Sequence, residues 1–148
     1  MTLAVSEAEL DALLVSVPFT RAYGFRLRAL AEGRCVLAVP FQKAFERPGG
    51  IVSGQVFMAA ADVAMWLAIM TRLGRTDMSA TAQMSTAFLD AVREAPFGCE
   101  ARVLKLGRRL VYGVAECVSE DGRLLAHSSL TYARPLGSAA LPAPGATE

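Results

Sequence analysis

The chain has 148 residues, which suits one domain able to bury roughly two-thirds of its unfolded surface. Hydrophobic residues make up 53% of it, and 15 Lys and Arg nearly balance 14 Asp and Glu, so no global field predicts binding to nucleic acid or to an anionic membrane. The high apolar fraction favours a homo-oligomer that covers surface one subunit would leave exposed.

The first part of the chain predicts a short helix and then a β-hairpin. Ser6 and Glu9 have capping-box spacing, which predicts an amphipathic helix within residues 1–17 that Pro18 ends. Strands are expected over residues 25–31 and 34–41, joined by a turn at residues 32–33. The polar loop at residues 42–50 contains Pro-Gly-Gly, so it is expected to be flexible and to border a site.

A central helix is predicted from Gly54 to Leu73, with Ser53 as its N-cap and Gly74 just after its end. The helix is apolar on every side, so we expect it to be enclosed. It is also the only plausible membrane segment, but its apolar run is shorter than the ~18 residues of a span and carries Asp62 at its centre. A buried core helix is therefore expected.

Four strands are expected after this helix, at residues 79–89, 98–106, 110–119 and 123–133, with a hairpin turn at residues 120–122. Short connections between consecutive strands imply an antiparallel sheet, and the whole pattern predicts an α+β fold in which a curved sheet wraps the helix. We expect one domain over residues 1–134 and a disordered tail at residues 135–148.

The three cysteines, Cys35, Cys99 and Cys117, are widely spaced and form neither a CxxC pair nor a cluster with histidines. They are interpreted as reduced core thiols, which together with the absence of a recognisable secretory signal predicts a cytoplasmic protein. No nucleotide-binding loop or metal-ligand cluster is found, so no cofactor and no metal are expected.

Asp62 is the strongest lead to function because it interrupts the apolar run from Val56 to Met70. A carboxylate removed from water needs a partner or has a task. Helical spacing puts it on one face with Gln55, Met58, Met65 or Trp66, and Ile69. A purely structural role is the alternative, in which Asp62 bonds to Thr81, Gln83 or a backbone N–H and holds strand to helix.

The segment GIVSGQVFMAAADVA, residues 50–64, resembles the signature of hotdog-fold acyl-CoA thioesterases of the phenylacetate-degradation (PaaI-like) type. Residues 81–89 and the hairpins at residues 107–109 and 122–126 extend the similarity over residues 25–134. The resemblance implies a hotdog fold, a curved antiparallel sheet around a long central helix. It also implies a site shared between two subunits, in a homodimer or in a homotetramer built as a dimer of dimers.

Transferred by position, the resemblance makes Gly54 the helix-opening glycine, Asp62 the catalytic carboxylate and Thr81 the hydroxyl that orients the attacking water. Ser53 stands where the family usually has histidine, and Gln55 where it has a second glycine. We expect the substrate to contact four residues around this helix: Ser53, Gln55, Met58 and Trp66. A basic turn that contains Arg108 and Arg109 is expected to hold the phosphates of coenzyme A.

The predicted reaction is hydrolysis of an acyl-CoA thioester by water that Asp62 activates, with backbone N–H groups at Gly54 and Gln55 stabilising the oxyanion. Direct attack by Asp62 to give an anhydride remains an alternative. Two other functions stay open. One is non-catalytic binding of acyl-CoA or another apolar ligand, and the other is a hydratase, for which His127 in the last strand is badly placed. Thr81, Gln83 and Ser85 are expected to share one polar face of their strand.

Overall fold

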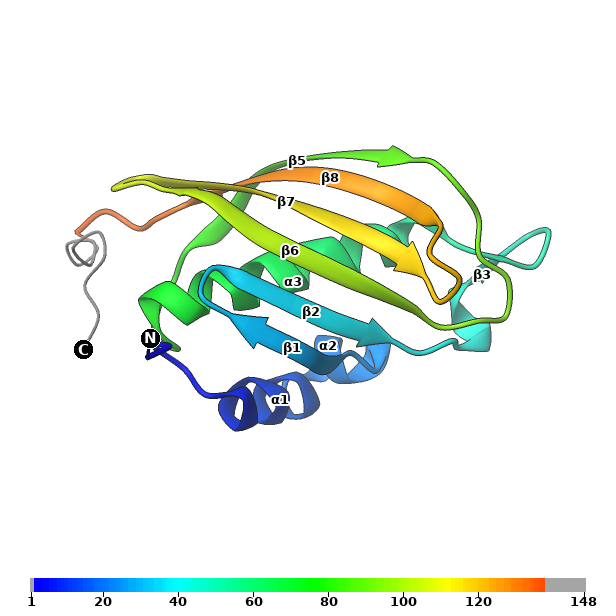
Figure 1. Cartoon of the computed structure of the whole chain (residues 1–148), viewed down its shortest axis with the longest axis horizontal. Coiled ribbons are helices and arrows are strands. Elements are labelled where there is room, and N and C mark those ends of the chain that lie inside the picture. The colour runs from blue at the N-terminus through cyan, green and yellow to red at the C-terminus, as the bar shows by residue number, and fades with distance from the viewer. Residues whose placement is uncertain (1, 138–148) are drawn as a thin grey trace.

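Six antiparallel strands form one sheet that curves around a long helix (Figure 1). The computed structural model describes residues 2–137. The strands of this sheet are β1 (Arg26–Ala31), β2 (Arg34–Val39), β5 (Ala80–Phe88), β6 (Phe97–Leu106), β7 (Leu110–Ser119) and β8 (Leu124–Ala133). Their spatial order is β1-β2-β6-β7-β8-β5. The predicted α+β architecture is confirmed, and most of the predicted tail lies outside the described residues.

The N-terminal segment forms two helices, α1 (Glu7–Ser16) and α2 (Pro18–Tyr23), where one was predicted. The capping box is present, since the Ser6 hydroxyl accepts from the Glu9 N–H at 3.1 Å and the Glu9 carboxylate accepts from the Ser6 N–H at 2.9 Å. Pro18 ends α1 as expected but also begins α2, because its fixed φ suits the first position of a helix.

The loop predicted over residues 42–50 is more ordered than expected. It contains a short 3₁₀ turn, η1 (Lys43–Phe45), and the strand β3 (Glu46–Arg47), which pairs with β4 (Ile51–Val52) in a separate two-stranded sheet. The Ser53 N–H donates to the Phe45 carbonyl at 2.8 Å, which ties this loop to the start of the central helix.

The central helix α3 (Gly54–Leu73) begins and ends as predicted. The Ser53 hydroxyl caps it by accepting from the Gln55 N–H at 3.4 Å, and the Gly74 N–H closes it on the Met70 carbonyl at 2.8 Å. It packs against β2, β6 and β7. Within the described residues, α3 has the length and hydropathy of a membrane span. However, 67% of its apolar 18-residue segment is buried inside the fold, as in a core helix.

The expectation that α3 is enclosed on all sides is wrong for one subunit. Gln55 and Met58 are exposed, and Asp62 and Trp66 are half-buried, so one stripe of the helix is open to solvent. Trp66 rather than Met65 continues this stripe, because Met65 and Ile69 are buried. The sheet covers only the side of the helix that it wraps.

Strand β5 forms one edge of the sheet, and among residues 2–137 its pairing partner is β8. Most of its residues are exposed on both faces, although it begins directly beside α3. An edge strand with free backbone groups and exposed side chains can pair with another chain.

The three cysteines lie in the core as predicted. Cys35, Cys99 and Cys117 are buried and unpaired, on neighbouring strands of the sheet. Burial raises the pKa of the Cys35 thiol to about 12, so this group stays protonated and unreactive near neutral pH.

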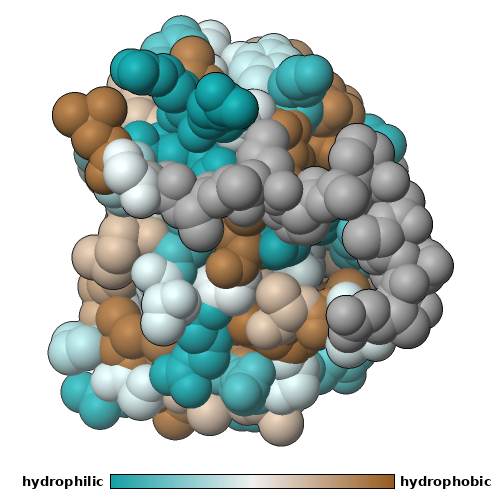
Figure 2. All heavy atoms as spheres, turned by 90° about the vertical axis from the view of Figure 1, so that its left-hand side faces the viewer, coloured by the Kyte–Doolittle hydropathy of each residue, from teal (hydrophilic) through white to brown (hydrophobic). Residues whose placement is uncertain are grey.

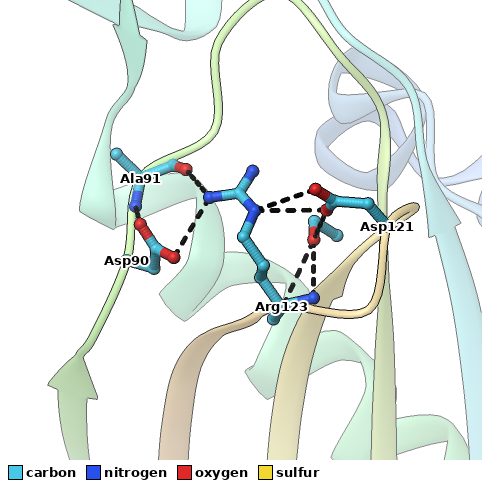
Figure 3. Close-up of polar contacts among 5 residues, drawn as sticks. Asp90, Ala91, Asp121 and Arg123 are labelled. Carbon is cyan, nitrogen blue, oxygen red and sulfur yellow. Dashed lines mark hydrogen bonds and ion pairs between the residues drawn. The ribbon is translucent and has the colours of Figure 1, made fainter.

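An arginine at the β7–β8 hairpin holds the segment that follows β5 (Figure 3). The Arg123 guanidinium donates to the Ala91 carbonyl at 2.9 Å and forms ion pairs with Asp90 and Asp121, both at 3.1 Å. The Ser119 hydroxyl accepts from the Arg123 N–H at 2.9 Å. This network anchors the end of β5 close to the start of α3.

The fit between helix and sheet predicts that Gly113→Ala destabilises the protein strongly. A methyl group on Gly113 in β7 would overlap the Arg102 carbonyl oxygen and the end of the Met65 side chain. Because the carbonyl belongs to the paired strand and cannot move alone, we expect a loss of about 3 kcal/mol in the free energy of unfolding, measured by urea denaturation.

Gly122→Ala is the matched control, since an added methyl there meets no atom within 4 Å and only a positive φ opposes it. Its expected cost is about 1 kcal/mol, from the left-handed backbone alone. Equal losses for the two variants would contradict the close packing of Gly113.

Candidate functional site

The carboxylate of Asp62 lies halfway along α3, on the open stripe, and contacts two strands. Its Oδ1 atom accepts from the Thr81 hydroxyl of β5 at 2.7 Å and from the Tyr132 hydroxyl of β8 at 2.6 Å. Its Oδ2 atom has no hydrogen-bond partner within residues 2–137. A half-buried carboxylate with one bound and one unbound oxygen can accept a proton from a molecule placed beside it.

Tyr132 was not identified by sequence analysis. It follows Asp62 by 70 residues, and its ring is only 3% exposed, so in the sequence it resembles any other core residue of a strand. Its hydroxyl also lies 2.8 Å from the Asp62 carbonyl oxygen. Only the packing of β8 against α3 brings the two residues together.

The Thr81 hydroxyl contacts Asp62, although the alternating pattern of β5 alone would not place it there. The β5–β8 register shifts between Thr81 and Gln83, so Thr81 pairs with inward-facing Tyr132 and Gln83 with outward-facing Thr131. Side chains of directly paired residues lie on the same face of a sheet. The expectation that Thr81 shares a face with Gln83 and Ser85 is therefore wrong, because the bulge turns Thr81 toward the helix.

The start of α3 is the second feature of the site. The Gly54 N–H has no acceptor in the described part of the chain, whereas the Gln55 N–H is bound to the Ser53 hydroxyl. An unbound N–H at a helix start can stabilise negative charge. Of the two groups proposed for this task, the structure leaves only that of Gly54 unbound.

Two hollows flank this helix start. One, of about 460 Å³, is lined by residues of α2, the 42–50 loop and the helix start, among them Tyr23, Phe45, Ser53 and Gln55. The other, of about 210 Å³, lies beside Gly54 and Phe88. A Cβ atom on Gly54 would stand 2.7 Å from Cε1 of the Phe88 ring, so the glycine is needed for this close approach.

The carboxylate and the helix start do not meet within one subunit. Asp62 follows Gly54 by eight positions, which corresponds to a rise of about 12 Å along the helix. One small carbonyl group cannot contact both. The structure thus brings Asp62 and Thr81 together but leaves Gly54 apart from them.

Apolar side chains surround Asp62 along the open stripe. Met58 is 37% exposed, and Trp66 stacks on Phe19 of α2 with ring centroids 6.5 Å apart. These residues form an apolar surface on both sides of the carboxylate. Such a surface can bury an acyl group or another protein chain.

The predicted basic turn, Arg108 and Arg109, lies at the same end of the sheet as Thr81. The Arg134 N–H donates to the Arg109 carbonyl at 2.8 Å, and Ala133 pairs with both Leu110 and Ala80. Both arginines are exposed, and neither has an ion-pair partner among the described residues. Figure 2 views the molecule from this end and shows hydrophilic side chains gathered at its top.

His127 lies on the outer face of the sheet, where its Nδ1 atom is 3.0 Å from the Glu116 carboxylate. Its neighbours in β8 at residues 126 and 128 are buried, so its ring points away from α3 and Asp62. The expectation of a sheet-surface role agrees with this position.

A long helix wrapped by a curved antiparallel sheet is the architecture of the hotdog class of proteins. The family described as "Thioesterase superfamily" matches residues 49–126, which is more than half of the chain. The protein belongs to the thioesterase superfamily, and within it to the PaaI-like hotdog proteins.

Individual relatives agree with this assignment. A Saccharolobus solfataricus protein named "Putative esterase" is 32% identical over 118 residues, 80% of this chain and 77% of that protein. A "Putative thioesterase" structure from Silicibacter sp. TM1040 is 33% identical, with a TM-score of 0.81 over 91% of this chain and 95% of that chain. A mutant of the phenylacetic acid degradation protein PaaI from Thermus thermophilus is 28% identical, with a TM-score of 0.73 over 80% of this chain and all of that one (100%).

Proposed function

We propose that this protein is an acyl-CoA thioesterase in which Asp62 acts as the general base that activates water. The unbound Oδ2 atom of a half-buried carboxylate, beside an apolar surface, is the observation that carries this proposal. Oδ2 takes a proton from water as the water oxygen attacks the thioester carbonyl carbon. The intermediate then collapses, the carbon–sulfur bond breaks, and the leaving thiolate takes up the proton.

Thr81 can serve both the carboxylate and the water. Its hydroxyl donates its proton to Asp62 Oδ1, so its oxygen remains free to accept a hydrogen bond from a water bound at Oδ2. The side chain is exposed, which gives water access. Thr81 is therefore assigned the task of orienting the nucleophile.

The oxyanion is assigned to the Gly54 N–H of a second subunit. The separation of about 12 Å within one chain excludes a shared carbonyl, whereas a two-fold dimer can place the helix start of one subunit beside the carboxylate of the other. The exposed edge strand β5 and the open stripe of α3 adjoin Asp62 and are the surfaces proposed to pair. Each dimer would then hold two sites.

A homotetramer, as a dimer of dimers, would use a different surface. Large apolar side chains are exposed near the β6–β7 turn, at Leu104 of β6 and Leu110 of β7. A patch of this kind favours a further contact between subunits. Sedimentation equilibrium of the purified protein distinguishes monomer, dimer and tetramer.

The substrate contacts follow from the same geometry. We assign Met58 and Trp66 to the acyl group, Ser53 and Gln55 to the thioester region at the helix start, and the exposed pair Arg108 and Arg109 to the phosphates of coenzyme A. A cytoplasmic location is also proposed, which the three unpaired buried cysteines support.

Complementation between two inactive variants tests the shared site. Asp62→Asn and Gly54→Pro, each inactive alone, should regain about a quarter of the wild-type rate when co-expressed in equal amounts, because about half of the dimers are mixed and each mixed dimer holds one complete site of two. Release of free thiol from short, long and aromatic acyl-CoAs is the measurement. No recovery with mixed dimers present would rule out the shared site.

Non-catalytic binding of acyl-CoA or another apolar ligand is the second candidate. The Phe88 ring packs against Gly54, and the Ser53 hydroxyl binds the Gln55 N–H, so the helix start is partly occupied. Ligand binding measured by calorimetry, without thiol release from any acyl-CoA, would establish this function in place of hydrolysis.

A further inference from the structure

Two hydroxyl groups from different strands bind the same carboxylate oxygen. Thr81 of β5 and Tyr132 of β8 both donate to Asp62 Oδ1, at 2.7 and 2.6 Å. A carboxylate oxygen has two lone pairs, so these donors fill its acceptor capacity. Rotation of the carboxylate would break both bonds, which fixes Oδ2 as the oxygen left for a third molecule.

The two donors differ in their access to water. Thr81 is exposed, so water can replace its hydroxyl if the side chain moves away. Tyr132 is 3% exposed and its ring fills the space between β8 and α3. Water therefore cannot readily replace the Tyr132 hydroxyl as a hydrogen-bond donor to Asp62.

The phenol of Tyr132 has one proton and two nearby acceptors, Asp62 Oδ1 and the Asp62 carbonyl oxygen at 2.8 Å. An ionised carboxylate is the stronger acceptor, so the proton lies toward Oδ1 when Asp62 is charged. Burial, followed by the negative charge of Asp62, raises the pKa of Tyr132 well above its ordinary value. The phenol therefore keeps its proton near neutral pH and can donate it to Asp62 in a hydrogen bond.

We propose that Tyr132 is a positioning residue for the reaction: it holds Asp62 Oδ1, so that Oδ2 is the atom that receives the proton of the attacking water. This inference rests on the proposed thioesterase function. Tyr132 does not touch the substrate, and the proton never passes through it. Its hydroxyl stabilises the ionised carboxylate and directs the free oxygen toward the open stripe of α3.

Tyr132→Phe tests this role because it removes the hydroxyl and keeps the ring. We expect kcat to fall about tenfold at neutral pH with little change in KM, since the carboxylate loses its fixed orientation. A residue that only supports the fold would lower the free energy of unfolding without this separate effect on kcat.

Tyr112→Phe is the matched control. Tyr112 lies in the neighbouring strand β7, is 42% exposed, and its hydroxyl has no hydrogen-bond partner in the described chain. Its kcat and KM should equal those of the wild type. A kcat that is unchanged in Tyr132→Phe, while Asp62→Asn is inactive, would overturn the role of Tyr132 and leave the function intact.

Failure of the proposed function gives a different result. If Asp62→Asn hydrolyses thioesters as fast as the wild type, the general-base assignment falls. The ¹³C chemical shift of the labelled Asp62 carboxyl at neutral pH then tests Tyr132 without any activity. A chemical shift that changes in Tyr132→Phe but not in Tyr112→Phe supports positioning, and one that is the same in all three proteins overturns it.

A second measurement does not depend on the folding of Tyr132→Phe. In the wild type, the Tyr132 hydroxyl proton should exchange slowly with solvent and appear as a separate ¹H resonance, because it is buried and bound to a carboxylate. Its chemical shift should change in Asp62→Asn. A hydroxyl resonance that is the same in both proteins would contradict the bond to Oδ1.

Discussion

Asp62→Asn should lower kcat for thioester hydrolysis by at least about 100-fold, the range expected for the loss of a general base. Asn is isosteric with Asp, and its carbonyl oxygen can still accept from the Thr81 and Tyr132 hydroxyls, so the contacts of α3 with β5 and β8 persist. The amide cannot take a proton from water. The measurement is free thiol released from a panel of acyl-CoAs, with circular dichroism to verify the fold.

Asp11→Asn is the matched control for this substitution. Asp11 lies on α1, where it pairs with Arg26 of β1, the strand at the opposite edge of the sheet from β5. Its kcat should match the wild type. Equal rates for Asp62→Asn and wild type would favour the binding protein, and an unfolded Asp62→Asn variant would favour a structural role for the carboxylate.

Gly54→Pro should lower kcat by about 100-fold relative to Gly54→Ala, because it removes the one N–H proposed to stabilise the oxyanion. Proline suits the first position of a helix, and the extended backbone of Ser53 (φ −61°, ψ 141°) is the conformation that precedes proline. The helix start should therefore be retained. Thiol release under saturating substrate is the measurement.

Gly54→Ala separates the loss of the N–H from the added bulk. Alanine places the same Cβ against the Phe88 ring but keeps the backbone donor, and the ring, 54% exposed, has room to move. The two variants should thus share any effect of displacing Phe88. Equal kcat values for them would show that the Gly54 N–H does not act on the reaction.

Local signals in the sequence were enough to predict the helix and the sheet and to single out Asp62. Capping at Ser53 and termination at Gly74 depend on contacts within a few residues, so the observed bounds of α3 match the prediction. The strands likewise end within two residues of their predicted limits, since alternation and turn residues are short-range signals. Asp62 was identified because its charge conflicts with its apolar surroundings.

Other features depended on contacts between distant residues. The bulge in β5 that turns Thr81 toward Asp62 arises from the register with β8, which no pattern within β5 contains. The Phe88 ring lies against Gly54 only because the end of β5 lies beside the start of the helix in the folded protein. Pro18 beginning a second helix was also missed, because the same residue is compatible with ending one helix and starting another.

The sequence by itself therefore determined that a helix carrying one acid lies inside a curved antiparallel sheet, because caps, turns and hydrophobic periodicity act over a few residues. Only the tertiary structure decided what that acid contacts. Tyr132 lies 70 residues from Asp62 and was indistinguishable in sequence from a core aromatic residue. The packing of β8 against α3 put its hydroxyl on Oδ1 and left the other carboxylate oxygen without a partner in the described chain.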